Sequence, residues 1–465
     1  MAAACLWLAG CAGVPDVEPL LNQPGDGQPT IVGARGPLTD KQSAALLKTK
    51  GVTGPEVDAL TRHLVIEEAV AETPLVAGNA VKVLRDGINT FRAMFAAIRG
   101  AKNHVHLEHY ILEDVESDGE KLSDLLLAKQ ASGVPVRIIY DSFGSGGTPG
   151  AFFDKLKNAG VLMVAFNPIN PFAAKGGYNP NDRDHRKILI ADGEVGIVGG
   201  VNLSSKYQSG PGKSGPPKKK PDNAPAVPPS TGEQGDEHWR DTDLEIRGPV
   251  VAQLQALFLE HWAQQKGPAF DDTSLLPRVA PAGTEIVRII GSTPRKWVPK
   301  YYVALLSAIR TAEKSILLSA AYFVPTRQER KDLEAAARRG VDVRLLLTGR
   351  SDSKMSLSVQ HSHYEDLFEA GIKIYETQNE ILHSKSVVVD GVWTIIGSSN
   401  LDHRSVLFND EVDAVIVGKA TGQTFTKMFE DDAKRAVLVD PELWKRRPFT
   451  SKVNDTLARI WESLL

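Results

Sequence analysis

Cysteine is almost absent from this sequence of 465 residues, in which only Cys5 and Cys11 occur, both close to the first residue. The chain after Cys11 can form neither a disulfide nor a thiolate metal site, so its fold must be held by packing alone. No His, Asp and Glu cluster has ligand spacing either, so no metal is expected. The later sequence also lacks an apolar run of about twenty residues, the length of a transmembrane helix. Any membrane attachment is therefore expected to be an anchor and not a span.

An excess of positive charge is missing as well, since 54 Lys and Arg face 57 Asp and Glu, for a formal charge of −3. Proteins that bind nucleic acid usually carry a basic surface, often interleaved with aromatic residues, and this sequence shows neither. Nucleic acid is therefore not an expected partner. What is present is an ordinary globular composition, with 42% hydrophobic and 24% charged residues, which predicts a large buried core.

The first residues resemble the end of a bacterial secretory signal. Leu8-Ala9-Gly10-Cys11 is similar to a lipobox, in which Cys11 becomes the lipidated first residue of the mature protein. This predicts a signal at residues 1–11 and a lipoprotein that faces the periplasm. The alternative is an unprocessed apolar tail on a peripheral protein at the cytoplasmic face of the inner membrane. Residues 12–54 are rich in Pro and Gly and are expected to form a flexible tether.

From Glu56 onward, short apolar strands alternate with amphipathic helices, which is typical of an α/β fold. The alternation occurs twice. The first copy contains the expected strand HVHLEHYIL, a helix and the strand VPVRIIYDS, and the second contains SILLSAAYFV, a helix and VDVRLLLTG at the corresponding positions. We therefore predict a tandem duplication with domains at 55–280 and 281–465, each a mixed β-sheet flanked by helices. The first domain alone contains an insert rich in Pro, Gly, Ser and Lys, at about 209–236, which is expected to be a mobile loop.

One motif occurs in both copies of this repeat. The first copy, HRKILIADGEVGIVGGVN, begins at residue 185, and the second, HSKSVVVDGVWTIIGSSN, begins at residue 383. In each copy, a histidine and a lysine two positions apart start an expected strand and therefore point to the same face. These pairs are His185 with Lys187 and His383 with Lys385. Each copy is expected to place an imidazole beside an ammonium group.

The rest of each copy predicts a hairpin. Asp192 and Asp390 each precede a glycine, the strongest signal of a two-residue hairpin turn, so both are expected to be structural. The small residues that end each copy let polar groups approach a ligand closely. The side chains expected to approach a phosphate there are Asn202, Ser398 and Asn400.

Two His-Lys pairs with two asparagines suit a phosphodiester substrate. Lysines and amides can bind the non-bridging oxygens and stabilise developing charge. One neutral histidine can attack phosphorus while a second, protonated histidine donates to the leaving alcohol, giving a phosphohistidine that another alcohol or water resolves. Because one reaction needs both histidines, the halves are expected to face each other across a pseudo-two-fold axis. Asp241 and Glu411 stand at matching positions before a strand-ending glycine and are expected to orient the two rings.

The doubled spacing H-x-K-x4-D-x6-G-x2-N resembles the phospholipase D superfamily. Over about residues 75–430 the context is similar to bacterial cardiolipin synthases, through NDRDHRKILIADG, HWRDTDLEIRGP, AAYFVP and GSSNLDHRS. The resemblance implies phosphatidyl transfer between membrane phospholipids without a metal or organic cofactor. Phosphatidylglycerol and phosphatidylethanolamine are the suspected donors, and the sequence does not separate them.

Several alternatives stay open at this point. A hydrolase of the phospholipase D or nuclease type would hand the intermediate to water, and a catalytically silent lipid-binding lipoprotein would not react at all. The two intact His-Lys pairs argue against the silent protein. Tyr110 and Tyr322 hold matching positions in the repeat and either line the cleft or pack in the core. The catalytic unit is expected to be a monomer.

Overall fold

A computed structural model describes residues 13–23, 27–52, 56–168, 170, 178–208, 238–270, 275–293 and 298–465. The predicted signal at 1–11, with Cys11, and the predicted insert at about 209–236 lie outside these described residues.

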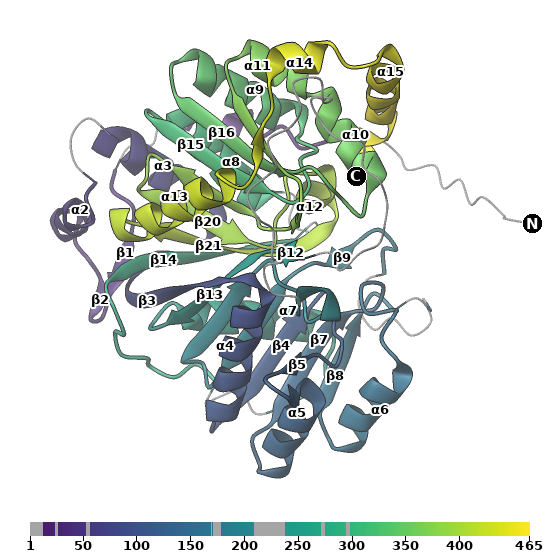
Figure 1. The fold of residues 1–465 in the computed structure, drawn as a ribbon. Helices are drawn as coiled ribbons and strands as arrows, with labels where there is room; N and C mark the ends of the chain where they lie inside the picture. Colours follow the sequence, from purple (N-terminus) through teal and green to yellow (C-terminus); the bar gives the residue numbers. More distant parts are fainter. Residues whose placement is uncertain are drawn as a thin grey trace, which may run out of the picture.

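The two halves of the chain lie one above the other in Figure 1, and their strand pairings repeat one order. In the first half the spatial order is β8 (Leu162–Phe166), β7 (Val136–Asp141), β4 (Val105–His109), β10 (Lys187–Ala191), β11 (Val195–Gly199), β13 (Thr242–Arg247) and β3 (Leu75–Arg85). In the second half it is β17 (Lys373–Thr377), β16 (Asp342–Thr348), β15 (Ser315–Ala320), β19 (Ser386–Val389), β20 (Trp393–Gly397), β21 (Asn409–Val417) and β14 (Glu285–Ser292).

Each half is a mixed sheet, because β8, β7 and β4 run parallel while the strands after β4 pair antiparallel, and the second half repeats this pattern. β3 and β14 pair antiparallel and join the halves. The matching orders on either side of this pair give the pseudo-two-fold relation expected from the repeat. The predicted α/β fold with tandem duplicated units is therefore confirmed.

The helices follow the same strands in the two halves, except that α10 and α11 of the second half stand where the first half has α6 alone. The first half contains α4 (Asp86–Gly100), α5 (Leu122–Ala131), α6 (Gly150–Asn158) and α7 (Val251–Gln264). The second contains α8 (Lys300–Thr311), α9 (Arg327–Arg338), α10 (Lys354–Ser362), α11 (Tyr364–Glu369) and α13 (Lys419–Ala433). One apolar cluster packs each half's own helices on its sheet, and a third combines strand residues of both halves with α7 and α13. This shared core fixes the halves relative to each other.

The two motif hairpins form for a local reason. All residues of β10 and β19 are buried, as their uninterrupted apolar runs require of interior strands. Asp192 and Gly193 have φ of 59° and 68°, and Asp390 and Gly391 have φ of 53° and 66°. A two-residue turn with positive φ at both positions matches the twist of the strands, and Asp-Gly tolerates it well.

The N-terminal segment differs from the expected tether. It forms α1 (Glu18–Leu21), β1 (Ile31–Gly33), β2 (Gly36–Pro37) and α2 (Asp40–Thr49). β1 pairs parallel with β3, and Ile31 and Leu47 are buried in the core of the second half. The prediction of a flexible tether over 12–54 is therefore wrong for the described residues. Pro19 lies inside α1 and Pro37 inside β2, so the prolines of this segment do not keep it from forming regular structure.

The helix α3 (Glu56–Ala71) was assigned to a first domain beginning at residue 55, but it packs on the second half. Glu67 is buried and accepts hydrogen bonds from Arg288 at 2.7 Å and from the indole N–H of Trp393 at 2.9 Å. The boundary expected from sequence is wrong for this helix, because sequence order does not reveal which sheet a helix covers. Among the described helices, none has both the length and the apolar character to cross a membrane.

The chain ends in β22 (Val437–Leu438), α14 (Pro441–Lys445), α15 (Phe449–Ala458) and the 3₁₀ helix η4 (Arg459–Leu464). The loops after the motif hairpins hold η2 (Ser205–Tyr207) and α12 (His403–Leu407), and β5 (Glu116–Ser117) pairs with β6 (Glu120–Lys121).

Candidate active site

Two short parallel pairings between the halves place the motif histidines. β9 (Arg183–Asp184) pairs with the first residues of β21, and β12 (Trp239–Arg240) pairs with β18 (Ile381–Leu382). In each case, the strand that leads to a histidine in one half lies beside the strand that leads to a predicted carboxylate in the other. The pairing continues at the histidines, whose backbone N–H groups donate to opposite carbonyls, His185 to Asp410 at 2.9 Å and His383 to Arg240 at 2.7 Å.

Each ring then contacts the carboxylate of the opposite half. His185 Nδ1 lies 3.0 Å from Glu411 Oε2, and His383 Nδ1 lies 2.7 Å from Asp241 Oδ2. Both carboxylates are fully buried. A carboxylate that engages Nδ1 fixes the ring orientation and leaves Nε2 for a ligand. The site therefore exists only when both halves are assembled.

The motif lysines lie against their own histidines. Lys187 Nζ donates to the carbonyl of His185 at 2.5 Å. Lys385 Nζ donates to the carbonyl of His383 at 2.6 Å and lies 2.9 and 3.1 Å from the two ring nitrogens. Burial lowers the pKa of Lys187 to about 7 and of Lys385 to about 8, against the opposing effect of the nearby carboxylates.

Burial favours the neutral form of both histidines. Burial lowers the pKa of His185 to about 4, although Glu411 opposes the shift. Burial, together with Lys385 and Lys187, holds the pKa of His383 well below its usual range. A neutral imidazole with a free Nε2 lone pair is the form that can attack phosphorus.

The two carboxylates have different surroundings. Burial raises the pKa of Asp241 to about 6. Burial also acts to raise the pKa of Glu411, but His185 and Lys187 outweigh it and the net shift is downward. Glu411 accepts from Ser398 Oγ at 2.5 Å, Ser405 Oγ at 2.8 Å and Asn409 Nδ2 at 3.1 Å. Ser398 thus lies behind the ring of His185, where it holds the carboxylate.

Tyr207, which stands outside the repeated motif, also contacts the site. Its hydroxyl lies 3.0 Å from His383 Nδ1 and accepts a hydrogen bond from Asn202 Nδ2 at 3.1 Å. Ser405 follows Asn400 at the same spacing as Tyr207 follows Asn202, so the repeat register could have identified the position. It could not have predicted that a tyrosine would reach the histidine of the other half.

The remaining predicted residues separate into two groups. Asn202, Asn400, Tyr110 and Tyr322 line the pocket with both histidines. The Tyr110 ring centre lies 5.2 Å from that of His185, and the Tyr322 ring centre lies 6.0 Å from that of His383. Among the described residues, the Oδ1 atoms of both asparagines are buried without a hydrogen-bond partner. Buried unsatisfied carbonyl oxygens are costly, which is consistent with a ligand contact.

The motif aspartates lie away from this pocket, at the hairpin turns. Asp192 accepts from the backbone N–H groups of residues 102, 103 and 104 at 2.7 to 3.0 Å. Asp390 accepts from those of residues 313, 314 and 315 at 2.7 to 3.0 Å. Each aspartate ties its hairpin to the start of the neighbouring strand, β4 or β15.

The pocket between the halves has a volume of about 550 Å³. This is within the usual range for small-molecule sites, roughly 300 to 1,000 Å³. Besides the residues above, its walls include Trp239, Phe143, Arg183, Lys206 and Arg404. Cationic groups beside aromatic rings suit a molecule that combines a phosphate with an organic headgroup.

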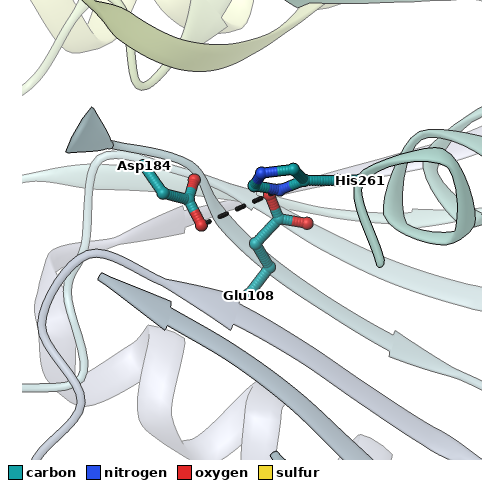
Figure 2. A group of neighbouring side chains, drawn as sticks. All are labelled: Glu108, Asp184 and His261. Atoms are coloured by element: carbon teal, nitrogen blue, oxygen red, sulfur yellow. Dashed lines mark hydrogen bonds and ion pairs between the residues drawn. The ribbon is translucent and has the colours of Figure 1, made fainter. Parts of the chain in front are cut away.

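A second buried group of titratable side chains lies behind β9. Ligand atoms of Glu108, Asp184 and His261 lie within 4.8 Å of one another (Figure 2). Arg186 already provides positive charge here, at 3.1 Å from Glu108 and 3.4 Å from Asp410. His261 Nδ1 lies 2.8 Å from the same Glu108 oxygen that Arg186 contacts. We interpret the group as an ion network that fixes the strand before His185, since a metal would compete with Arg186 for Glu108.

Comparison with known proteins agrees with this geometry. The family model described as cardiolipin synthase, PLD-like domain, matches residues 94–210 and 305–433. A cardiolipin synthase of Geobacillus kaustophilus is 34% identical over 402 residues, which cover 85% of this chain and 74% of that protein. One of Geobacillus thermodenitrificans is 34% identical over 407 residues, with the same coverage of 85% and 74%.

Among solved structures, a phosphatidylserine synthase of Haemophilus influenzae superposes with a TM-score of 0.62 at 12% identity, covering 89% of this chain and 100% of that chain, which shows a shared fold. The two matched segments fall one in each half and contain both motif histidines. The chain therefore belongs to the PLD-like family of the cardiolipin synthases.

Proposed function

We propose that this protein is a phosphatidyltransferase of the cardiolipin synthase type, which moves a phosphatidyl group from one phospholipid to the headgroup hydroxyl of another. The observation that carries the proposal is the pair of histidines at one pocket, each oriented by the carboxylate of the opposite half. Relatives that are 34% identical over most of the chain have the name cardiolipin synthase. Phosphatidylglycerol and phosphatidylethanolamine remain the proposed donors.

In the first half-reaction, Nε2 of one histidine attacks the phosphorus of the donor lipid. The N–P bond forms as the P–O bond to the headgroup alcohol breaks, and the other histidine, protonated at Nε2, transfers that proton to the leaving oxygen. Lys187 and Lys385 stabilise the charge on the non-bridging oxygens. The anionic phosphate raises the proton affinity of these lysines and of the acid histidine, so substrate binding supplies the protonation that burial opposes.

The second half-reaction reverses these roles. The histidine that acted as acid is now neutral and accepts the proton of the incoming alcohol, whose oxygen attacks phosphorus. The P–O bond forms and the N–P bond breaks, which regenerates the free enzyme. The carboxylate at each Nδ1 stabilises whichever ring carries the extra proton. Water in place of the alcohol would give a hydrolase.

The test is incubation of the purified protein with radiolabelled phosphatidylglycerol vesicles in EDTA, followed by separation of the lipid products. Cardiolipin and free glycerol are the expected products. Phosphatidic acid as the sole product would replace the transferase with a phospholipase D-type hydrolase. Loss of activity in EDTA that zinc or magnesium restores would refute the metal-free mechanism.

The location of the protein is a separate proposal. We propose that Cys11 is acylated and anchors the protein at the periplasmic side of a membrane, and the sequence Leu8-Ala9-Gly10-Cys11 supports this. The alternative is a peripheral protein on the cytoplasmic face of the inner membrane. A phospholipid substrate requires contact with a bilayer in either case.

A further inference from the structure

The C-terminal segment exposes its apolar side chains. Phe449 and Ile460 are 79% and 70% exposed, and Val453, Leu457 and Trp461 are exposed as well. Phe449, Val453 and Leu457 recur at a spacing of four along α15, so they share one side of the helix, and Ile460 and Trp461 continue from it in η4. We call these five side chains the C-terminal apolar face.

The opposite side of the segment is attached by polar contacts. Asp455 is buried and lies 3.0 Å from Arg447, and Arg459 Nε donates to Ser362 Oγ at 2.9 Å. Glu462 lies 3.4 Å from His363. α15 lies beside α10 (Figure 1), whose last residue is the Ser362 that Arg459 contacts. A surface helix normally buries its apolar side and exposes its polar side, so this arrangement is inverted. A fixed apolar face of this kind marks an interaction site.

The face lies at the mouth of the catalytic pocket. Leu465, which directly follows η4, lines the pocket, and its carbonyl accepts from the backbone N–H of Arg404 at 3.3 Å. Ser353 and Ser356 of the α10 region line the same wall, and Met355 between them is 43% exposed. Phe143, another wall residue, is 67% exposed. Exposed apolar side chains therefore occur on the C-terminal segment and also among, or next to, the residues that line the pocket.

We propose that the C-terminal apolar face inserts into the surface of a phospholipid bilayer and thereby places the pocket mouth against the headgroups. The choice of lipid as partner rests on the proposed function. Phe449 and Trp461 lie at the two ends of the face, and aromatic rings are favoured at the membrane interface. Lys445 and Arg446 precede Phe449 in the sequence and Lys452 precedes Val453, and such basic residues suit anionic headgroups. A stable protein interface would use about 20 to 30 residues a side, far more than this single stripe offers.

The experiment uses the full chain with Cys11→Ser, so that no acyl chain contributes to binding. Flotation with vesicles of phosphatidylglycerol and phosphatidylethanolamine measures the bound fraction for Phe449→Glu, for Trp461→Glu and for a matched control, Leu276→Glu, which alters an exposed leucine outside the face. Each face variant is expected to weaken vesicle binding by about tenfold or more. The substitution replaces an apolar side chain that would insert into the bilayer with a carboxylate, which is unfavourable there. The control should bind like the parent protein.

Turnover separates this proposal from the function on which it rests. The face variants should lose activity on vesicles and keep it on a short-chain phospholipid below its critical micelle concentration. Unchanged vesicle binding in both face variants would overturn the proposal. If the same variants also changed the oligomeric state measured by gel filtration, the face would instead be a contact with a second copy of the chain. If the parent protein turns over neither substrate while the face variants still lose binding, the docking surface stands and the proposed function fails.

Discussion

At the scale of single residues, the central feature of the candidate site is that each histidine contacts a carboxylate from the other half. Glu411 holds His185, and Asp241 holds His383. Hydrogen-bond partners of a ring determine which nitrogen is free to react. Because the partner comes from the other repeat, neither half can orient its histidine alone. This explains in physical terms why the motif occurs twice.

Replacing either histidine tests this arrangement. His185→Ala and His383→Ala should each lower turnover by about a thousandfold or more, since the nucleophile and the general acid have different tasks at one phosphorus. The double variant should be little worse than the single ones, because the residues act as a unit. Melting curves should show folded protein. Near-normal turnover in either single variant would contradict a shared site.

The same variants can identify the nucleophile if the substrate carries p-nitrophenol, which leaves without acid assistance. The variant that lacks only the acid should release a burst of nitrophenol and retain phosphate on its remaining histidine. The variant that lacks the nucleophile should give no burst. Bursts from both variants would show that the roles are interchangeable.

Tyr207 is the second test at this scale. Tyr207→Phe removes a hydroxyl that lies 3.0 Å from His383 Nδ1 and keeps the buried ring. We expect kcat to fall about tenfold with little change in KM, as for loss of one hydrogen bond at a reacting group. Tyr302→Phe is a matched control, because its hydroxyl contacts Thr326 at 3.0 Å, away from the pocket. Equal losses of kcat in both variants would assign Tyr207 a general structural role.

The pH dependence follows from the buried lysines. Burial lowers the pKa of Lys187 to about 7 and of Lys385 to about 8, so the free enzyme loses its ammonium charges as the pH rises through that window. Because the ammonium form binds phosphate, kcat/KM should fall on the alkaline side, with apparent pKa values between about 7 and 8. The fall in kcat should come at higher pH, since bound phosphate stabilises the ammonium form. A pH-rate profile measures both, and a flat profile up to pH 9 would exclude this role.

At the scale of elements, the sequence predicted what has a strong local signal. The hairpins after β10 and β19 follow from apolar runs that end in Asp-Gly, and the repeat placed the matching strands. The pairings of β9 with β21 and of β12 with β18 had no such signal, because two-residue strands have no periodicity to detect. Those pairings depend on the docking of the halves. The sequence indicated candidate residues and facing halves, but not that each ring would contact the carboxylate of the other half.

For the N-terminal segment, a high content of Pro and Gly predicts a flexible tether, but composition does not show whether the apolar residues between them pack. Leu47 is 2% exposed in the second-half core, and β1 pairs with β3. Leu47→Ala should lower the free energy of unfolding by about 2 to 5 kcal/mol, the usual cost of such a cavity. Lys48→Ala changes an exposed neighbour and should have little effect. Equal urea midpoints for both variants would mean that the segment does not pack in solution.

At the scale of the whole molecule, the two proposals give the chain two attachments to a membrane. One is the proposed acyl anchor at Cys11, and the other is the C-terminal apolar face beside the pocket. Stable membrane binding usually requires two signals, because a single acyl chain or one short amphipathic helix binds reversibly. The anchor would keep the protein near the bilayer, while the face would orient the pocket opening toward the lipid headgroups. These tasks can be separated by experiment.

Cys11→Ser is the variant that removes only the anchor. We expect it to abolish acylation, detected as a changed gel position, and to move much of the protein to the soluble fraction. Phospholipid turnover in cells should fall far more than turnover of detergent-dispersed substrate, because tethering raises the effective concentration only at a bilayer. If the variant sediments with membranes and runs at the same gel position as the parent protein, Cys11 is not acylated. Membrane contact would then depend on the C-terminal face and other surface groups, and an enzyme at the cytoplasmic face would become the better interpretation.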